Sequence, residues 1–172
     1  PLMRNTNGEW DKSRREAYNY VTNKEEVQSF WMERLNELKH SENIYTIGMR
    51  GVHDGKMQGT ESLDEQTQVL SQVIADQRDL LTQSLGADVA HIPQAFMPYK
   101  EVLDIYNNGL KVPEDVTIVW CDDNYGYITR LNDKEEQKRK GGAGIYYHIS
   151  YFGKPHDYLW LYLSLIHISE PT

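Results

Sequence analysis

The chain has 172 residues, of which 39% are hydrophobic and 26% charged, and its formal net charge at pH 7 is −8. This length suggests one domain, and the negative charge argues against a nucleic-acid-binding protein, which needs a basic surface. No apolar run reaches the roughly 18 residues of a membrane span, and the first residues carry no secretory signal. The single cysteine, Cys121, excludes an internal disulfide and a multi-cysteine zinc site.

Hydrophobic periodicity predicts helices and short apolar strands in alternation along the chain. Asn23 with Glu26, and Ser62 with Glu65, have the spacing of capping boxes and predict where two helices begin. Residues 130–142 are charged and predict an exposed loop or an irregular helix. Helices are expected from Asn23 through Leu38, over 63–85 up to Gly86, and over Tyr99–Asn108 up to Gly109. Strands are expected over 44–48, 89–93, 116–120 and 143–149.

Continuous apolar strands that alternate with amphipathic helices predict parallel strand pairing and an α/β fold. Both a doubly wound sheet and a (β/α)₈ barrel satisfy this order. Polar residues after several of the strands favour the barrel, whose catalytic residues lie at the carboxyl ends of its strands. A complete barrel takes about 250 residues, so we expect the first half of a barrel over residues 41–161, truncated at both ends, after a helical lead-in over residues 1–40.

The final segment, residues 162–172, does not continue the preceding pattern. Its sequence Ser-Leu-Ile-His-Ile-Ser-Glu-Pro-Thr resembles a peptide produced when sequencing-adapter DNA is translated. We therefore expect a non-native tail and exclude it from the fold prediction.

Two groups of carboxylates are candidates for catalysis. Asp122, Asp123 and Asn124 directly follow the 116–120 strand, where adjacent carboxylates are costly to place for structure alone. They could activate a water or bind sugar hydroxyls, and an Asx turn is the structural alternative. Glu101 lies in the first turn of its helix and could serve as a general acid. Judged by its spacing alone, it is a surface residue that complements the helix dipole.

Basic and aromatic side chains follow the first and fourth strands. Arg50, His53 and Asp54 share a glycine-rich loop, where an arginine could bind a carboxylate through two parallel hydrogen bonds. A solvated loop with a local salt bridge is the alternative. His148 shares a strand face with Tyr146, and Tyr151 follows.

Metal binding and cysteine catalysis are weaker readings of the same residues. His53, Asp54, Asp122 and His148 could in principle bind a metal, but no tight metal-ligand spacing is present. We therefore expect no metal cofactor. Cys121 follows a buried strand and is expected to pack in the core instead of acting as a nucleophile.

Four segments together resemble one family. They are Tyr45–Gly51 (YTIGMRG), Tyr99–Val102 (YKEV), Trp120–Gly126 (WCDDNYG) and Gly141–His148 (GGAGIYYH). In this order and spacing they resemble glycoside hydrolase family 115, the xylan α-glucuronidases, over residues 9–161.

The resemblance implies hydrolysis that releases glucuronic acid, or its 4-O-methyl ether, from glucuronoxylan with inversion of configuration and without a cofactor. It also implies a large multidomain protein with a (β/α)₈ catalytic domain, secreted or periplasmic because its substrate is a polymer. Neither a nucleic-acid nor a membrane partner is expected, whereas a homodimer is compatible with the family.

The resemblance also assigns roles. Inverting glycosidases use a carboxylic acid and a second carboxylate about 6.5–9.5 Å apart. Glu101 matches the Tyr-Lys-Glu-Val motif as the acid, while Asp54 is the first candidate for the base and Asp122 the second. The remaining candidates bind substrate. Arg50, His53 and His148 would meet the substrate carboxylate, and Asp123, Asn124, Tyr146 and Tyr151 its hydroxyls.

Two other classes of function stay open. A carbohydrate-binding module without turnover would bind sugar after loss of Glu101. A metal-dependent hydrolase on an α/β scaffold would lose activity to a chelator. Because half a barrel exposes unpaired strand edges and part of its core, residues 1–172 alone are expected to aggregate or pack loosely and to be inactive.

Overall fold

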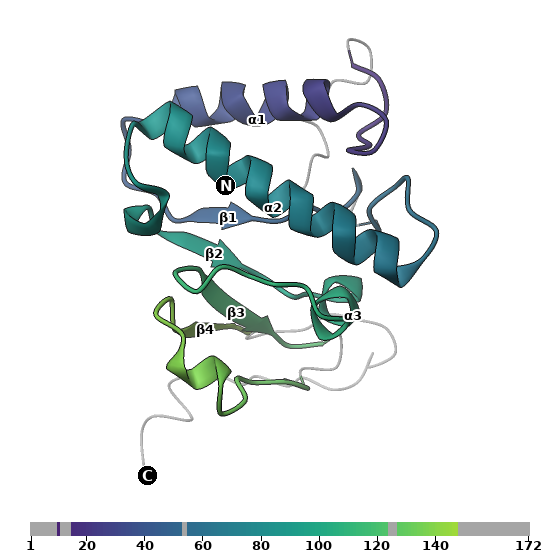
Figure 1. Ribbon diagram of the computed structural model, residues 1–172, viewed down its shortest axis with the longest axis vertical. Helices are drawn as coiled ribbons and strands as arrows, with labels where there is room; N and C mark the ends of the chain where they lie inside the picture. Colours follow the sequence, from purple (N-terminus) through teal and green to yellow (C-terminus); the bar gives the residue numbers. More distant parts are fainter. Residues whose placement is uncertain (1–9, 11–14, 53–54, 124–126, 148–172) are drawn as a thin grey trace, which may run out of the picture.

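The computed structural model describes residue 10 and residues 15–52, 55–123 and 127–147. Three α-helices and four strands alternate in these ranges, in the predicted order (Figure 1). The elements are α1 (Lys24–Leu38), β1 (Tyr45–Ile47), α2 (Leu63–Leu85), β2 (Gln94–Phe96), α3 (Glu101–Asn107), β3 (Thr117–Cys121) and β4 (Ala143–Tyr146). Two short 3₁₀-helices are η2 (Val89–His91) and η3 (Glu136–Lys138).

The four strands form one parallel sheet in the order β1-β2-β3-β4. Ile47 pairs with Phe96, Phe96 with Ile118, and Cys121 with Tyr146. The α/β class and the parallel pairing predicted from the sequence are therefore confirmed. Because all strands point the same way, the segments that follow them share one edge of the sheet.

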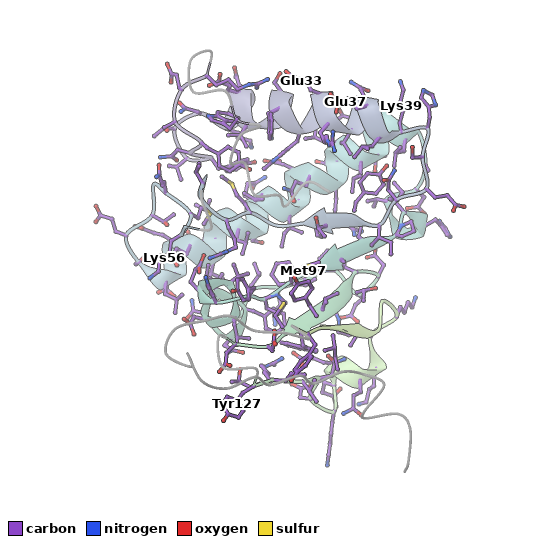
Figure 2. The ribbon with its side chains drawn as sticks, turned by 180° about the vertical axis from the view of Figure 1, so that it is seen from behind. Glu33, Glu37, Lys39, Lys56, Met97 and Tyr127 are labelled. Carbon is purple, nitrogen blue, oxygen red and sulfur yellow. The ribbon has the colours of Figure 1, made fainter. Side chains whose placement is uncertain are left out.

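Helices α2 and α3 lie on one face of this sheet, whereas α1 packs against α2. Ile47, Phe96 and Trp120 point toward α2 and α3 and are at most 2% exposed, and the ring of Tyr106 on α3 contacts both aromatic rings. On the other face Thr46 and Val119 are only partly buried. Figure 1 shows α2 and α3 in front of the sheet, and Figure 2, seen from behind, shows the sheet in front of α2.

Helix α2 begins and ends as its sequence predicts. Ser62 accepts a hydrogen bond from the Glu65 backbone, the Glu65 side chain accepts one from the Ser62 backbone, and Gly86 ends the helix at φ 63°. The capping box predicted at Asn23 is wrong. The Asn23 side chain donates to the Ala17 carbonyl instead and leaves α1 without a side-chain cap.

The strand predicted over 89–93 is also wrong. Asp88 caps Val89–His91 as a 3₁₀-helix by accepting a hydrogen bond from the Ala90 backbone. Pro93 has no N–H for a sheet, and its carbonyl accepts the Tyr45 N–H just before the paired strands begin. The strand starts only after Pro93, at Gln94.

No α-helix connects β3 to β4 in the described part of that crossover. The segment instead contains η3 and packs through Arg130, whose guanidinium lies 4.4 Å from the Trp120 ring centroid and 2.8 Å from Glu136. This agrees with the prediction of a loop or irregular helix over 130–142. Strand β4 was predicted to reach residue 149, but residues 148–149, like the tail over 162–172, lie outside the described residues.

Candidate active site

Arg50 and Glu101 meet at the carboxyl edge of the sheet. Arg50 lies three residues beyond β1, and Glu101 is the first residue of α3, which follows β2. Nε and Nη2 of Arg50 each donate to one oxygen of Glu101 at 2.9 Å. The two side chains are 11% and 13% exposed. The structure thus joins two residues that the sequence placed in one site for different roles.

The backbone just before Glu101 is strained. Lys100 has φ 51° and ψ −124°, the angles of the first central position of a type II′ turn, where glycine is preferred. The Val102 N–H donates to the Tyr99 carbonyl across this turn. The Tyr99 ring centroid lies 5.3 Å from the Arg50 guanidinium carbon. The strained turn therefore places both Glu101 and an aromatic surface against Arg50, and strain of this kind concentrates at functional sites.

Gln77 contacts the loop that carries Arg50, and sequence reasoning did not select it. The side chain is fully buried on α2, where it accepts a hydrogen bond from the Gly48 N–H at 2.7 Å and donates to the Gly48 carbonyl at 3.0 Å. One signal could have identified it. Gln77 occupies the apolar face of α2, between Val73 and Leu81, where the helical period calls for a hydrophobic residue.

The predicted carboxylates after β3 differ in their surroundings. Asp122 is 1% exposed, and its N–H donates to the Tyr146 carbonyl. Asp123 is only partly buried, and its side chain accepts a hydrogen bond from the Tyr127 N–H at 2.9 Å. The Asp123 side chain thus bonds a backbone N–H four residues on, whereas an Asx turn joins residues two apart, and Asp122 is a buried carboxylate at the end of a strand.

Tyr146 ends β4 beside Cys121 and is 50% exposed. Tyr146 therefore lies on the sheet face that the helices do not cover. Burial and the neighbouring Asp122 carboxylate raise the pKa of the Cys121 thiol to about 11. The thiol is protonated near neutral pH, which does not favour a nucleophilic role.

Five predicted site residues, His53, Asp54, Asn124, His148 and Tyr151, lie outside the described residues. The positions on either side of His53 and Asp54 are joined, because the Gly51 N–H donates to the Gly55 carbonyl at 2.9 Å. Within residues 15–52, 55–123 and 127–147, no three His, Cys, Asp or Glu side chains form a metal-binding group. No helix in these ranges is long and apolar enough to cross a membrane.

A shallow polar pocket of about 510 Å³ adjoins Glu101. It lies between the loop after β1, the start of α2 and the exposed side of α3, and Figure 2 shows Lys56 at this edge. Carboxylate, amide and ammonium groups of this kind can hydrogen-bond sugar hydroxyls. The lining residues are Lys56, Leu63, Gln66, Glu101, Asp104, Asn107 and Asn108.

The sequence profile described as glycosyl hydrolase family 115 matches residues 1–169. The chain belongs to this family. Family 115 also includes a similar solved structure, described as a 4-O-methyl-α-glucuronidase, BtGH115A, with specificity for decorated arabinogalactans. That protein is 57% identical, superposes with a TM-score of 0.84, and is matched over 92% of this chain. No curated protein matches.

The match spans 21% of the length of BtGH115A. The resemblance inferred from the four sequence segments is confirmed, and with it the assignment to glycoside hydrolases.

Proposed function

We propose that this chain is a segment of the catalytic domain of an α-glucuronidase that releases glucuronic acid, or its 4-O-methyl ether, from a polysaccharide. The observation that carries the proposal is the buried pair of Arg50 and Glu101 at the carboxyl edge of the sheet, in a family 115 chain. A carboxyl group and a guanidinium beside a polar pocket are suited to a substrate that has both a glycosidic bond and a carboxylate.

In the proposed mechanism Glu101 protonates the leaving oxygen while a second carboxylate activates water, which inverts the configuration at the sugar carbon. Asp54 is our first candidate for that base and Asp122 the second. In the structure both oxygens of Glu101 accept hydrogen bonds from Arg50, so Glu101 must release one of them and take up a proton from solvent on that oxygen before it can protonate the leaving group. The carboxylate of an arriving substrate is a chemically equivalent partner for Arg50 and would make this exchange possible.

We also propose that the sheet is the first half of a (β/α)₈ barrel. The strands follow one another in chain order, all parallel, and the buried side chains of β1 and β3 face the helices. A barrel requires both features, because its helices form an outer ring. A doubly wound sheet has helices on both faces and reverses its strand order at a switch point.

The polysaccharide and the location remain parts of the proposal. The family resemblance points to glucuronoxylan, whereas the solved relative is described as acting on decorated arabinogalactans. At 57% identity the second is our leading substrate class, and both carry the same terminal uronic acid. Cleavage of a polymer favours a secreted or periplasmic enzyme.

The test is an assay of the full-length protein, meaning the product of the complete open reading frame. Arabinogalactan and glucuronoxylan would be incubated with it, with and without EDTA, and released uronic acid measured. We expect release that EDTA does not change and that Glu101→Gln abolishes, with the exposed Glu37→Gln as a matched control of unchanged activity. Sugar binding without release would favour the carbohydrate-binding alternative. Loss of release on chelation would favour a metal-dependent hydrolase.

A further inference from the structure

We infer that Gln77 is a positioning residue for the reaction: its side chain holds the backbone of Gly48 and thereby sets the place of Arg50 against Glu101. The inference rests on the proposed function, because it takes this pair to be part of the catalytic site. It assigns a role to a helix residue that does not itself contact the pair.

The contact between Gln77 and Gly48 is a two-point clamp. The amide oxygen of Gln77 accepts the Gly48 N–H at 2.7 Å, and the amide nitrogen donates to the Gly48 carbonyl at 3.0 Å. Two opposed hydrogen bonds to one residue fix both the distance and the orientation of that peptide segment. Gly48 has φ 104°, a backbone conformation that residues other than glycine rarely adopt. The clamp thus holds the chain where it turns away from β1.

The clamped residue lies two positions before Arg50, and the short connection is itself fixed. Met49 is only 2% exposed, and on the far side the Gly51 N–H donates to the Gly55 carbonyl at 2.9 Å. The backbone on both sides of Arg50 is therefore anchored. A shift at Gly48 would be transmitted to the guanidinium, which must reach two carboxylate oxygens at once.

Packing alone does not call for glutamine at this position. The other buried residues of the same face of α2 are apolar: Leu70, Val73, Ile74 and Leu81. A buried polar side chain is tolerated only when it is hydrogen-bonded. The Gln77 amide makes its hydrogen bonds to Gly48, in the loop that carries Arg50. Its neighbour Arg78 instead donates to Gln94, the first residue of β2, and to Asp115, two residues before β3. Helix α2 therefore contacts both ends of the sheet, and Gln77 serves the catalytic edge.

The experiment uses Gln77→Met in the full-length protein, which keeps the length of the side chain and removes both hydrogen bonds. Leu81→Ala is the matched control, since it destabilises the same buried face and the apolar leucine side chain makes no hydrogen bond to Gly48. All variants would be assayed well below their melting temperatures. We expect Gln77→Met to lower kcat/KM by about tenfold or more, since small misplacements of catalytic groups are costly. The kcat/KM of Leu81→Ala should stay within about twofold of the wild-type value, because a residue independent of the catalytic pair should not change it further.

A double-mutant cycle separates positioning from general destabilisation. If Gln77 acts through Arg50, Gln77→Met should change kcat/KM by less than about threefold when Arg50 is already lysine, because neighbouring residues in one network are not additive. A full and independent loss in the Arg50→Lys background would overturn the inference. Should Gln77→Met fail to fold, Gln77→Leu takes its place, since it also removes both hydrogen bonds and matches the apolar residues of the same helix face.

Hydrogen exchange distinguishes failure of this inference from failure of the proposed function. In Gln77→Met the amides of residues 48–51 should exchange faster than in the wild type, with no such change in Leu81→Ala. If the wild-type protein releases no uronic acid, the proposed function fails, and exchange alone decides whether Gln77 holds this loop. Unchanged exchange at residues 48–51 would overturn the inference whatever the activity.

Discussion

Arg50 and Glu101 lie 51 positions apart in the sequence and are joined by two parallel hydrogen bonds of 2.9 Å. Each side chain comes from the segment after a different strand, and β1 and β2 are neighbours in the sheet. The pair is therefore a direct consequence of the parallel pairing, which brings the carboxyl ends of the two strands together. Because both residues are mostly buried, a change in one should be felt by the other.

Arg50→Lys should lower kcat/KM of the full-length protein by about ten- to hundredfold. Lysine is a point charge and cannot form the two parallel hydrogen bonds of a guanidinium or stack on Tyr99 in the same way. A loss of one charge-assisted hydrogen bond of about 1.5–3 kcal/mol corresponds to this range. The measurement is steady-state release of uronic acid.

Arg34→Lys is the matched control for this prediction. Arg34 pairs with Glu37 on the surface of α1 at 2.7 Å, and the two side chains are 32% and 63% exposed. Such pairs contribute little, so its kinetics should equal those of the wild type. Equal activity of Arg50→Lys and wild type would show that the two parallel hydrogen bonds of the guanidinium are not used in the reaction.

Lys100→Gly should stabilise the protein by about 1 kcal/mol. A residue other than glycine in a sparsely populated backbone region costs about 1–3 kcal/mol, and part of that gain is offset because glycine makes the unfolded chain more flexible. Lys111→Gly, in an exposed loop, should destabilise the protein slightly. It makes the unfolded chain more flexible but removes no backbone strain from the folded one. The melting temperatures of the two variants should therefore move in opposite directions. A fall for both would contradict strain at Lys100.

The sequence predicted the α/β class, the alternation of elements and the parallel sheet, because long amphipathic helices and apolar strands have clear periodic patterns. It failed at Val89–His91, because a short strand and a short helix can have the same apolar pattern. There the hydrogen bond to the Asp88 side chain favours a 3₁₀-helix. It also failed at Asn23, whose side chain found a partner in Ala17 instead of the helix backbone. Both outcomes depend on local hydrogen bonds that periodicity does not encode.

The candidate site could be predicted only as a set of residue types. The family resemblance selected Arg50 and Glu101, but the bidentate contact between them depends on strand register, which the sequence does not state. Gln77 was missed because it lies on a helix face that was taken as core. The roles assigned to all the site residues, Arg50 and Glu101 included, stay predictions.

Gly51→Ala should disturb the loop that carries Arg50. A Cβ at this position would lie 2.2 Å from the Lys56 carbonyl oxygen, too close for any real contact, and the obstacle is backbone that cannot move aside cheaply. We expect a lower melting temperature and a loss of kcat/KM of at least tenfold. Gly86→Ala is the control. It introduces strain at φ 63° but meets no atom within 4 Å, so it should lower stability by about 1–2 kcal/mol and leave kcat/KM unchanged.

The pair of Arg130 and Glu136 should make the protein sensitive to acid. Arg130 donates to both oxygens of Glu136 at 2.8 and 3.1 Å, and the Tyr106 hydroxyl donates to one of them at 2.6 Å. Burial on its own would raise the pKa of Glu136, but these hydrogen bonds and the one from the Asp133 N–H hold it below the ordinary value of 4.5. Conversely, burial and the Glu136 carboxylate raise the pKa of the Tyr106 hydroxyl to about 12, so it stays a donor at neutral pH.

The sign of the effect follows from the lowered pKa of Glu136. Below pH 4.5 the unfolded chain binds a proton at this carboxyl group before the folded chain does, so stability decreases as the pH falls. The stabilising contribution is complete above pH 4.5 and is lost once the pH passes below the folded-state pKa. Glu136→Gln should therefore melt at a lower temperature than the wild type at pH 7, and the difference should shrink as the pH approaches 3. Glu135→Gln, which changes an 81% exposed side chain, should follow the wild-type curve throughout, and a constant difference between Glu136→Gln and wild type across this range would show that the charge of Glu136 is not what stabilises the β3–β4 crossover.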